Sequence, residues 1–224
     1  MEKIFDNTAL NLLPLPNGFI VAFCKSDEEP QGKMVVAYNL VSFEKETVSS
    51  VTRSVYQLAK FGKNYKEIEQ KLNAPFYWKT IFLPSENIFC YYPDGNAKII
   101  DEAGNIKWEG TVTYGNCGAS DFALHSGNLW ATFPEKNCIA RINLRTMKEE
   151  LRIGGESSAF GSPESLFLDG DNLYVCDSAS QVVWRVNTLN YSVSEYLSFE
   201  EPVYQFMIIG DTQIARLESG VYRI

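Results

Sequence analysis

The most constraining feature of this chain is a segment that repeats. Its clearest copy is PESLFLDGDNLYVCDSASQVVWRVN, residues 163–187, which predicts strands at 164–168, 172–177 and 181–186. Gly and Asp suit the tight turns between these strands, whereas Leu, Val, Tyr and Trp favour the strands themselves. The middle strand is apolar on both alternating faces, so we expect it to be buried between two neighbouring sheets.

Weaker copies of this segment follow at a nearly constant interval. The middle strands align at Asn87, Asn128, Asn172 and Thr212, which are 41, 44 and 40 residues apart. A four-stranded blade of a β-propeller occupies about 40–45 residues. Five cycles fit when residues 15–23, LPNGFIVAF, belong to the first. We therefore predict an all-β fold, a five-bladed β-propeller of four-stranded antiparallel blades, forming a single domain over residues 1–224.

The two ends of the chain complement each other. Residues 1–6 form a spare short strand ahead of the first cycle, and the last cycle stops after its third strand. We predict that the N-terminal strand joins residues 220–224 in the C-terminal blade and closes the ring, which removes edges that invite aggregation. The alternative is a frayed terminus. Within the first cycle, residues 8–62, we expect the fourth strand to end near residues 61–62.

One insertion interrupts the β pattern, at residues 63–74, KNYKEIEQKLNA. Tyr65, Ile68 and Leu72 are spaced like one face of a helix, with Glu and Lys between them, so we predict a short helix here. It is either a loop that covers apolar blade surface or a lid over one mouth of the central channel.

Composition excludes some partners and favours a compartment. The net charge is −8, and the Lys and Arg residues form no concentrated basic face. We therefore expect neither nucleic acid nor a membrane surface as partner. We expect neither a signal peptide nor a transmembrane segment, because residues 1–6 contain no apolar run of signal length and no long apolar run follows. The five cysteines form no CxxC pair, and Cys24, Cys90 and Cys176 fall in predicted middle strands. Cysteine in such strands is usually a small buried hydrophobe, and we predict a reduced, cytoplasmic setting.

No motif predicts a metal, a cofactor or a nucleophile. His125 is the only histidine and lies at a predicted turn, so no Ser-His-Asp or Cys-His arrangement is indicated. Residues 169–172, DGDN, resemble half of a calcium loop but lack the downstream Glu. We expect a turn there and no bound cofactor.

Polar residues recur where the first strand of each cycle begins. When the cycles are aligned, four polar residues occupy equivalent positions, namely Thr80, Asp121, Ser165 and Gln205. Their preceding neighbours are Lys79, Ser120, Glu164 and Tyr204. First strands line the channel of a propeller, so these residues predict a polar ring at one mouth. The ring either holds water and satisfies strand ends or forms a small polar pocket. In the second case Asp121 and Glu164 form a carboxylate pair on adjacent blades, a weak candidate for glycoside chemistry.

Aromatic residues gather on the same connections, at Phe76, Tyr77, Trp78, Tyr114, Phe160 and Tyr204. Such side chains can stack on a sugar or anchor a peptide. The alternative is that they only wedge between blades.

The clearest copy of the segment resembles the repeat of NHL-type propellers. Pro163, the run DNLYV at residues 171–175, Asp177 and the pair at 185–186 match its pattern, Pro…Gly-Asn-Leu-Tyr-Val-x-Asp…Val-x-Arg-Val. Residues 127–143 match in part and lack the Asp. The resemblance covers about two blades and implies a propeller with a binding surface.

We expect a non-catalytic binding or scaffold protein that uses one mouth of the channel, with a protein or a small polar ligand as partner. One alternative is a small-ligand or carbohydrate binder that uses the aromatic connections. The other is a glycosidase or lyase that uses Asp121 and Glu164. Fold resemblance does not decide among them.

Overall fold

A computed structural model describes residues 1–6, 9–14, 19–25, 33–39, 45–47, 79–84, 87–92, 94–101, 103–156 and 159–224. The chain forms two compact units, one of Met1–Tyr65 with Val203–Ile224 and one of Lys66–Pro202. Most of the described residues are in strands, the rest are mainly turns and connections, and there is little helix beyond the 3-10 turn at Pro134–Lys136. The predicted all-β class is confirmed.

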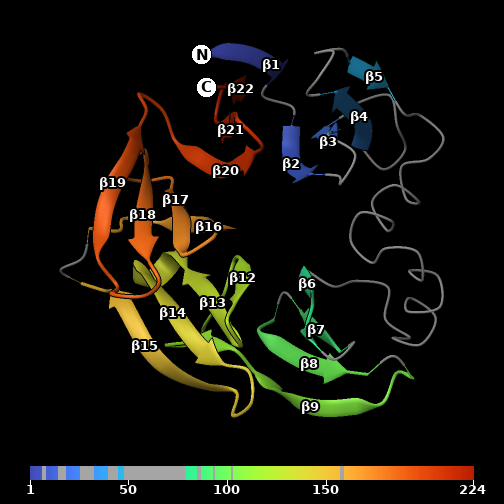
Figure 1. Cartoon of the computed structure of the whole chain (residues 1–224), viewed down its shortest axis with the longest axis vertical. Helices are drawn as coiled ribbons and strands as arrows, with labels where there is room; N and C mark the ends of the chain where they lie inside the picture. The colour runs from blue at the N-terminus through green and yellow to red at the C-terminus, as the bar shows by residue number, and fades with distance from the viewer. Residues whose placement is uncertain are drawn as a thin grey trace. The chain divides into compact units, whose positions relative to one another are not determined.

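The second unit contains three four-stranded antiparallel sheets, each built from four strands that follow one another in the sequence (Figure 1). A two-stranded hairpin connects the first sheet to the second. The strands are β6 (Lys79–Phe82), β7 (Ile88–Tyr91), β8 (Asn96–Ile100) and β9 (Ile106–Thr111), then the hairpin β10 (Thr113–Tyr114) and β11 (Cys117–Gly118), then β12 (Phe122–His125), β13 (Asn128–Phe133), β14 (Cys138–Asn143) and β15 (Lys148–Gly154), then β16 (Pro163–Asp169), β17 (Asn172–Asp177), β18 (Val182–Asn187) and β19 (Val193–Ser198).

The first unit contains two four-stranded antiparallel sheets. One is built from four strands in sequence order, and the other joins three C-terminal strands to the N-terminal strand, in the order β1-β22-β21-β20. The strands are β1 (Glu2–Asp6), β2 (Ala9–Pro14), β3 (Phe19–Lys25), β4 (Lys33–Asn39) and β5 (Lys45–Thr47), and then β20 (Val203–Ile209), β21 (Thr212–Leu217) and β22 (Gly220–Arg223).

The two ends of the chain pair with each other, as predicted. β1 is antiparallel to β22, with Glu2 opposite Arg223 and Asp6 opposite Gly220. Gly220 lies so close to β1 that a Cβ atom there would sit 2.4 Å from the Phe5 carbonyl oxygen. Ile4 and Phe5 are buried, at 2% and 5% exposure. The N-terminal strand is therefore a packed part of its sheet and not a frayed terminus.

The described sheets follow the predicted repeat, with one correction. The middle strand of the clearest copy spans Asn172–Asp177 as predicted, and Gly127, Gly170 and Gly210 adopt the positive φ that the preceding turns require. In the first cycle the fourth strand is Lys45–Thr47, so the prediction that it ends near residues 61–62 is wrong. The predicted helix at 63–74 lies outside the described residues.

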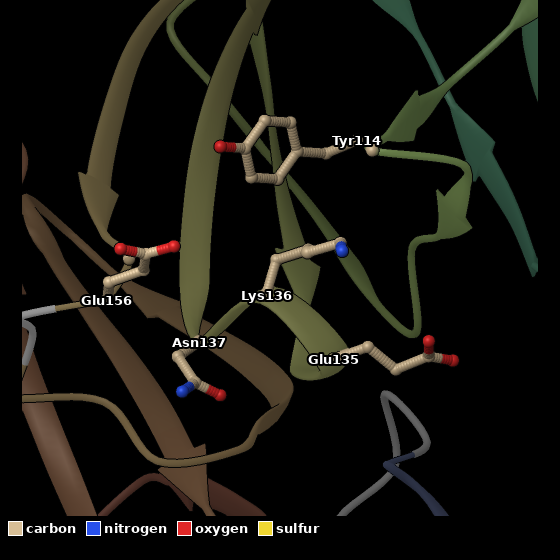
Figure 2. A pocket seen from close by; sticks show the side chains of 7 residues that line it. Tyr114, Glu135, Lys136, Asn137 and Glu156 are labelled. Atoms are coloured by element: carbon tan, nitrogen blue, oxygen red, sulfur yellow. The ribbon is translucent and has the colours of Figure 1, made fainter.

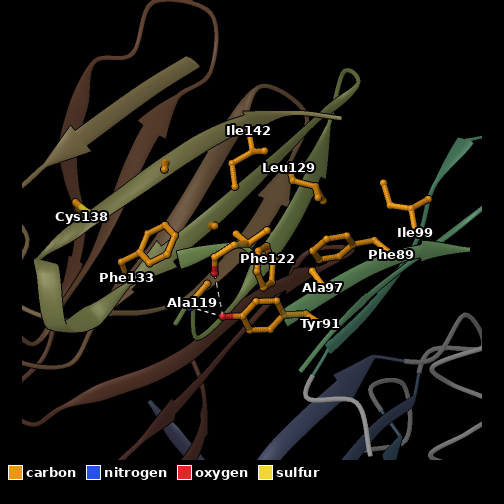
Figure 3. Packing of buried hydrophobic residues seen from close by; sticks show 13 residues of the cluster. Phe89, Tyr91, Ala97, Ile99, Ala119, Phe122, Leu129, Phe133, Cys138 and Ile142 are labelled. Carbon is orange, nitrogen blue, oxygen red and sulfur yellow. Dashed lines mark hydrogen bonds between the residues drawn. The ribbon is translucent and has the colours of Figure 1, made fainter. Parts of the chain in front are cut away.

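Burial follows the position of each strand within its sheet. β13 and β17 are buried along nearly their whole length and β7 along all of it, because both of their faces are apolar. The fourth strands β9, β15 and β19 are largely exposed. One core cluster joins the first two sheets of the second unit, where the rings of Phe89 and Tyr91 meet Phe122 edge-on (Figure 3).

Tyr91 also fixes the connection between these two sheets. Its hydroxyl accepts a hydrogen bond from the Ala119 N–H (2.7 Å) and donates one to the Val112 carbonyl (3.2 Å) (Figure 3). Burial raises the pKa of Tyr91 above its ordinary value, because the charged phenolate is poorly solvated there. The hydroxyl therefore stays protonated and holds both groups.

Replacing Ile4 by Ala should lower the free energy of unfolding by about 3 kcal/mol, because it leaves a cavity beneath β1. Urea unfolding of the full chain measures this loss. Lys3→Ala, on the same strand but exposed, should cost about 0.5 kcal/mol. A loss below about 1 kcal/mol for Ile4→Ala would show that β1 contributes little to its sheet.

Tyr91→Phe should lower the free energy of unfolding by about 2 kcal/mol, because the buried Ala119 N–H and Val112 carbonyl both lose a partner. The matched control is Tyr114→Phe, since the Tyr114 hydroxyl bonds to no described residue. Equal losses in the two variants would contradict this role for Tyr91.

A candidate binding surface where the first strands begin

In the second unit, the beginnings of the three first strands lie together. The Lys79 ammonium group at the start of β6 forms an ion pair with Asp121, which precedes β12. The other Asp121 oxygen, Oδ2, accepts a hydrogen bond from the Leu166 N–H of β16 (2.9 Å). We call this end of the three sheets the near end. Because strands alternate in direction, it also carries the second-to-third-strand turns and the connections between sheets.

Asp121 is a structural residue. It is 7% exposed, and its Oδ1 atom accepts a further hydrogen bond from the Phe122 N–H (2.8 Å). Both oxygens are therefore satisfied by groups from β6, β12 and β16. A carboxylate with this many donors holds neighbouring strands in register and has little capacity left for a ligand.

Hydroxyl groups add a second connection between the sheets that begin with β12 and β16. Ser120 Oγ donates to the Glu164 carbonyl oxygen (2.6 Å) and lies 2.8 Å from Thr132 Oγ1. Thr132, which is fully buried, also accepts a hydrogen bond from the Asp121 N–H (3.0 Å). Ser120 therefore serves the backbone of the next sheet.

Asp177 organises the near-end loops of the third sheet. It is fully buried, and its two oxygens accept hydrogen bonds from the N–H groups of Gly161 (2.6 Å), Ser162 (2.8 Å) and Ser180 (3.0 Å) and from Trp184 Nε1 (3.3 Å). A Cβ atom on Gly161 would lie 2.9 Å from Ser180 Oγ. The segment that leads into β16 is thus held firmly against the β17–β18 turn.

Glu164 differs from these two acids because its carboxylate faces other side chains only. Its Oε1 atom accepts hydrogen bonds from the hydroxyls of Ser162 and Ser178, both at 3.0 Å. Glu164 is also the extra residue of a β-bulge, since Pro163 pairs with Asp177 and Ser165 with Cys176. Its side chain is half-buried.

A groove opens at the near end of the second sheet (Figure 2). It has a volume of about 340 Å³ and is bordered by the β10–β11 hairpin, the β13–β14 turn and the end of β15. Tyr114 forms one wall, and the Arg152 guanidinium lies 3.6 Å from the centre of its ring. The lining residues are Tyr114, Gly115, Glu135, Lys136, Asn137, Gly155 and Glu156.

The groove adjoins the loop that carries Ser162. With its amide oriented so that nitrogen faces the neighbouring carbonyls, Asn137 donates to Pro134 O (3.0 Å) and Gly161 O (2.5 Å). Gly161 in turn is held by Asp177. The groove and the loops beside Glu164 are therefore parts of one connected surface.

The predicted polar level is shifted by one residue in the first sheet of this unit. Lys79 pairs with Tyr91 and Thr80 with Cys90, so Lys79, and not Thr80, stands at the level of Asp121 and Ser165. The reason is the β6–β7 turn, which is one residue longer than the turn at residues 126–127. Thr80 Oγ1 is buried without a hydrogen-bond partner.

In the first unit, Gln205 repeats what Asp121 does in the second. Its Oε1 atom accepts a hydrogen bond from the Leu12 N–H of the other sheet (3.0 Å), at the position equivalent to Leu166. Gln205 also accepts one from Arg216 Nε (3.1 Å). The Arg216 guanidinium lies 4.8 Å from the centre of the Tyr204 ring. The predicted residue Gln205 thus links two sheets, whereas Tyr204 contacts Arg216 of its own sheet.

The aromatic candidates have different roles. Phe160 is 3% exposed and packs edge-on against Trp184, with ring centres 6.2 Å apart, so it wedges between elements. Tyr114 is half-buried and lines the groove. Tyr77 and Trp78 lie outside the described residues.

The described residues show no catalytic arrangement around the proposed acids. The carboxylates of Asp121 and Glu164 share no hydrogen-bond partner. His125 Nε2 lies 3.2 Å from Thr188 Oγ1 and 3.5 Å from Asp171 Oδ1. Both neighbours approach the same ring nitrogen, whereas a nucleophile and an orienting acid need opposite nitrogens. His125 therefore contacts turns of the next sheet at the end opposite to the near end, which we call the far end.

Cysteines and metal ligands give no site in the described part of the chain. No group of three His, Cys, Asp or Glu side chains is placed to hold a metal ion there. Cys90 and Cys176 are buried in middle strands, as predicted, and Cys138 is buried as well. Cys117 lies 3.1 Å from Glu135 Oε2, and this hydrogen bond raises the pKa of its thiol. The described residues include no helix with the length and apolarity that a bilayer crossing requires.

Sequence reasoning missed most of the groove. It identified Tyr114 but not Glu135, Lys136, Asn137 or Glu156. The available signal was topological, because second-to-third-strand turns lie at the same end as the connections between sheets. The turn PEKN at residues 134–137 could have been placed beside Tyr114 on that ground.

The sheets and their connections define a β-propeller-like fold, and comparison with solved structures agrees. A streptogramin B lyase matches with a TM-score of 0.54 and 8% identity, over 98% of this chain and 69% of that one. The computationally designed Ika8 protein (TM-score 0.52, 9% identity) and Saccharomyces cerevisiae Sqt1 (0.50, 12%) each match over 94% of this chain and over 56% and 57% of their own.

These likenesses establish the fold alone, because the identities are so low. No family model matches the chain, so the NHL resemblance stays a prediction. No curated protein matches it either.

Asp177→Asn should lower the free energy of unfolding by about 3 kcal/mol, because the new amide N–H groups face donors that have no other acceptor. Asp169→Asn, on the same sheet but exposed, should change it by less than about 0.5 kcal/mol. Urea unfolding of both variants provides the comparison. A loss in Asp177→Asn as small as that of Asp169→Asn would contradict the organising role of Asp177.

Proposed function

We propose that this protein is a non-catalytic binding protein on a β-propeller-like scaffold, and that the near end is its contact surface. The partner is a protein or a small polar ligand. A cytoplasmic location, and the exclusion of nucleic acid and membrane as partners, remain predictions from the sequence.

The observation that carries this proposal is the groove of about 340 Å³, formed by three separate loops that meet at the near end. Ligand sites in proteins have volumes of about 300–1,000 Å³ and combine apolar walls with a few polar groups. Here Tyr114 supplies an aromatic wall, and Glu135, Lys136 and Glu156 supply charged groups. The sheets beneath these loops are tied together by Asp121, and Asp177 fixes the adjacent loops of the third sheet.

The hydrogen bonding of the acids favours binding over catalysis. Asp121 and Asp177 are buried and fully used by backbone and side-chain donors. A general acid or base must reach a substrate proton directly or through one water. Of the proposed pair only Glu164 retains an oxygen for a ligand, which leaves a glycosidase or lyase mechanism without its second carboxylate.

We also propose that the five sheets are the blades of one closed ring. The support is a repeated contact. Asp121 of one sheet accepts a hydrogen bond from Leu166 of the next, and Gln205 of the last sheet accepts the equivalent bond from Leu12 of the first. The same side-chain level thus links consecutive sheets and also links the last sheet to the first.

A small polar ligand, such as a carbohydrate, is the second candidate. The groove favours it, because Tyr114 offers an aromatic ring beside several charged and amide groups. A thermal-shift screen with saccharides tests it, since a ligand that binds only the native state raises the melting temperature.

The proposed contact surface can be tested with a photo-crosslinking residue introduced at Glu156 or Ala179 at the near end, and at Leu189 at the far end as control. All three residues are exposed. In cells that express the chain, both near-end positions should crosslink the same partner and Leu189 should not. Crosslinks from Leu189 alone would overturn the proposal.

A further inference from the structure

Glu164, Ser162 and Ser178 form a cluster whose free hydrogen-bonding capacity is that of an acceptor. Both serine hydroxyls donate to Glu164 Oε1 at 3.0 Å. A hydroxyl has one proton, so each serine retains only lone pairs once it has donated. An ionised carboxylate is an acceptor as well. The three side chains therefore leave no side-chain donor for a ligand.

The second carboxylate oxygen, Oε2, is available. No described residue donates a hydrogen bond to it or forms an ion pair with it. Among the described side chains, the only polar atoms that are buried without a partner are Thr80 Oγ1 and Arg141 Nε. Since Oε2 is not one of them, it reaches solvent.

The cluster is held in place before any ligand arrives. Asp177 fixes the Ser162 N–H (2.8 Å), and the Ser178 N–H donates to the Ser162 carbonyl (3.0 Å). The backbone of Glu164 is fixed in turn, because its carbonyl accepts a hydrogen bond from Ser120 Oγ. Preorganisation of this kind lowers the entropic cost of binding.

The charges at the near end favour a cation. The described residues there include Asp94, Glu135, Glu156, Glu200 and Glu201 in addition to Glu164. The cations beside them are Lys136, Lys79, which is paired with Asp121, and Arg152, which is paired with Glu149 and lies against Tyr114. The whole chain has a net charge of −8. Such a field attracts positively charged groups and speeds their association.

We propose that Glu164, Ser162 and Ser178 bind a positively charged hydrogen-bond donor, an ammonium or guanidinium group. This inference rests on the proposed function and specifies its partner. The group comes either from a Lys or Arg side chain of a polypeptide or from a free amine. A single carboxylate with two hydroxyls falls short of the six to eight oxygens that Ca²⁺ requires.

The neighbouring groove favours the polypeptide source. Asn137 lines the groove and also contacts Gly161, next to Ser162. A peptide that places one cationic side chain against Glu164 therefore finds room for its adjacent residues in the groove. Figure 2 shows Glu135 and Glu156 at the borders of this space.

The test uses NMR titration of the ¹⁵N-labelled chain. The probes are acetyl-Gly-Arg-Gly-amide, acetyl-Gly-Lys-Gly-amide, the neutral norleucine tripeptide, and guanidinium and butylammonium as free cations. The cationic probes should shift the amide signals of Gly161, Ser162 and Ser178, and the norleucine peptide should not. Binding of the peptides alone assigns the polypeptide source, whereas equal binding of the free cations assigns the free amine.

Glu164→Gln should weaken the binding of cationic probes about tenfold, because the charge-assisted hydrogen bond is lost while the shape is kept. The matched control is Glu200→Gln, which removes an exposed charge from the same end but outside the groove and should weaken binding less than twofold. Ser162→Ala with Ser178→Ala should weaken it about threefold, through lost positioning of Glu164.

The inference is wrong if no cationic probe shifts these three amides, or if Glu164→Gln has no greater effect than Glu200→Gln. Shifts confined to Gly115 and Gly155 would overturn it and leave the proposed surface intact, since those residues line the groove. The proposed function fails separately, when crosslinking occurs from Leu189 alone.

Discussion

The hydrogen bond from the Leu166 backbone to the Asp121 carboxylate is the constraint on which the second unit depends. Apolar packing between sheets is non-directional and tolerates sliding, whereas this bond fixes the level at which two first strands meet. Lys79, at the start of β6 in the first sheet of this unit, forms an ion pair with the same carboxylate. Gln205 shows that the charge itself is dispensable, because a neutral amide makes the equivalent bond to Leu12 in the first unit.

This constraint explains why the polar residues at the beginnings of the first strands are poor functional candidates. A buried polar group must be satisfied, and here the nearest donors belong to the next sheet. Asp121, Ser120 and Gln205 are therefore used to join sheets. The polar groups that are still available to a ligand lie in the near-end loops, which these joined strands support.

The fold was largely predictable because its turns have local chemical requirements. Asn143 and Asn187 each end a third strand, and each accepts hydrogen bonds from two N–H groups of the turn that follows. Such residues repeat with the sheets and make the period visible. The shift from Thr80 to Lys79 was not predictable, because one extra turn residue changes the alignment without changing the strand pattern. The use of Asp121 was equally hidden, since its partner is a backbone group 45 residues away.

The β-bulge in the first strand explains how one fold can present different chemistry at the same place. In β16 the bulged residue is Glu164, in β20 it is Tyr204, and in β2 it is Leu10. A bulged residue is left out of the ladder, so its side chain is re-aimed without loss of the flanking pairs. The residues on either side must satisfy the packing between sheets, whereas the bulged residue is released from that requirement. Glu164 is thus a position where an acid can be placed against solvent at the near end while Asp121, on the preceding sheet, is buried.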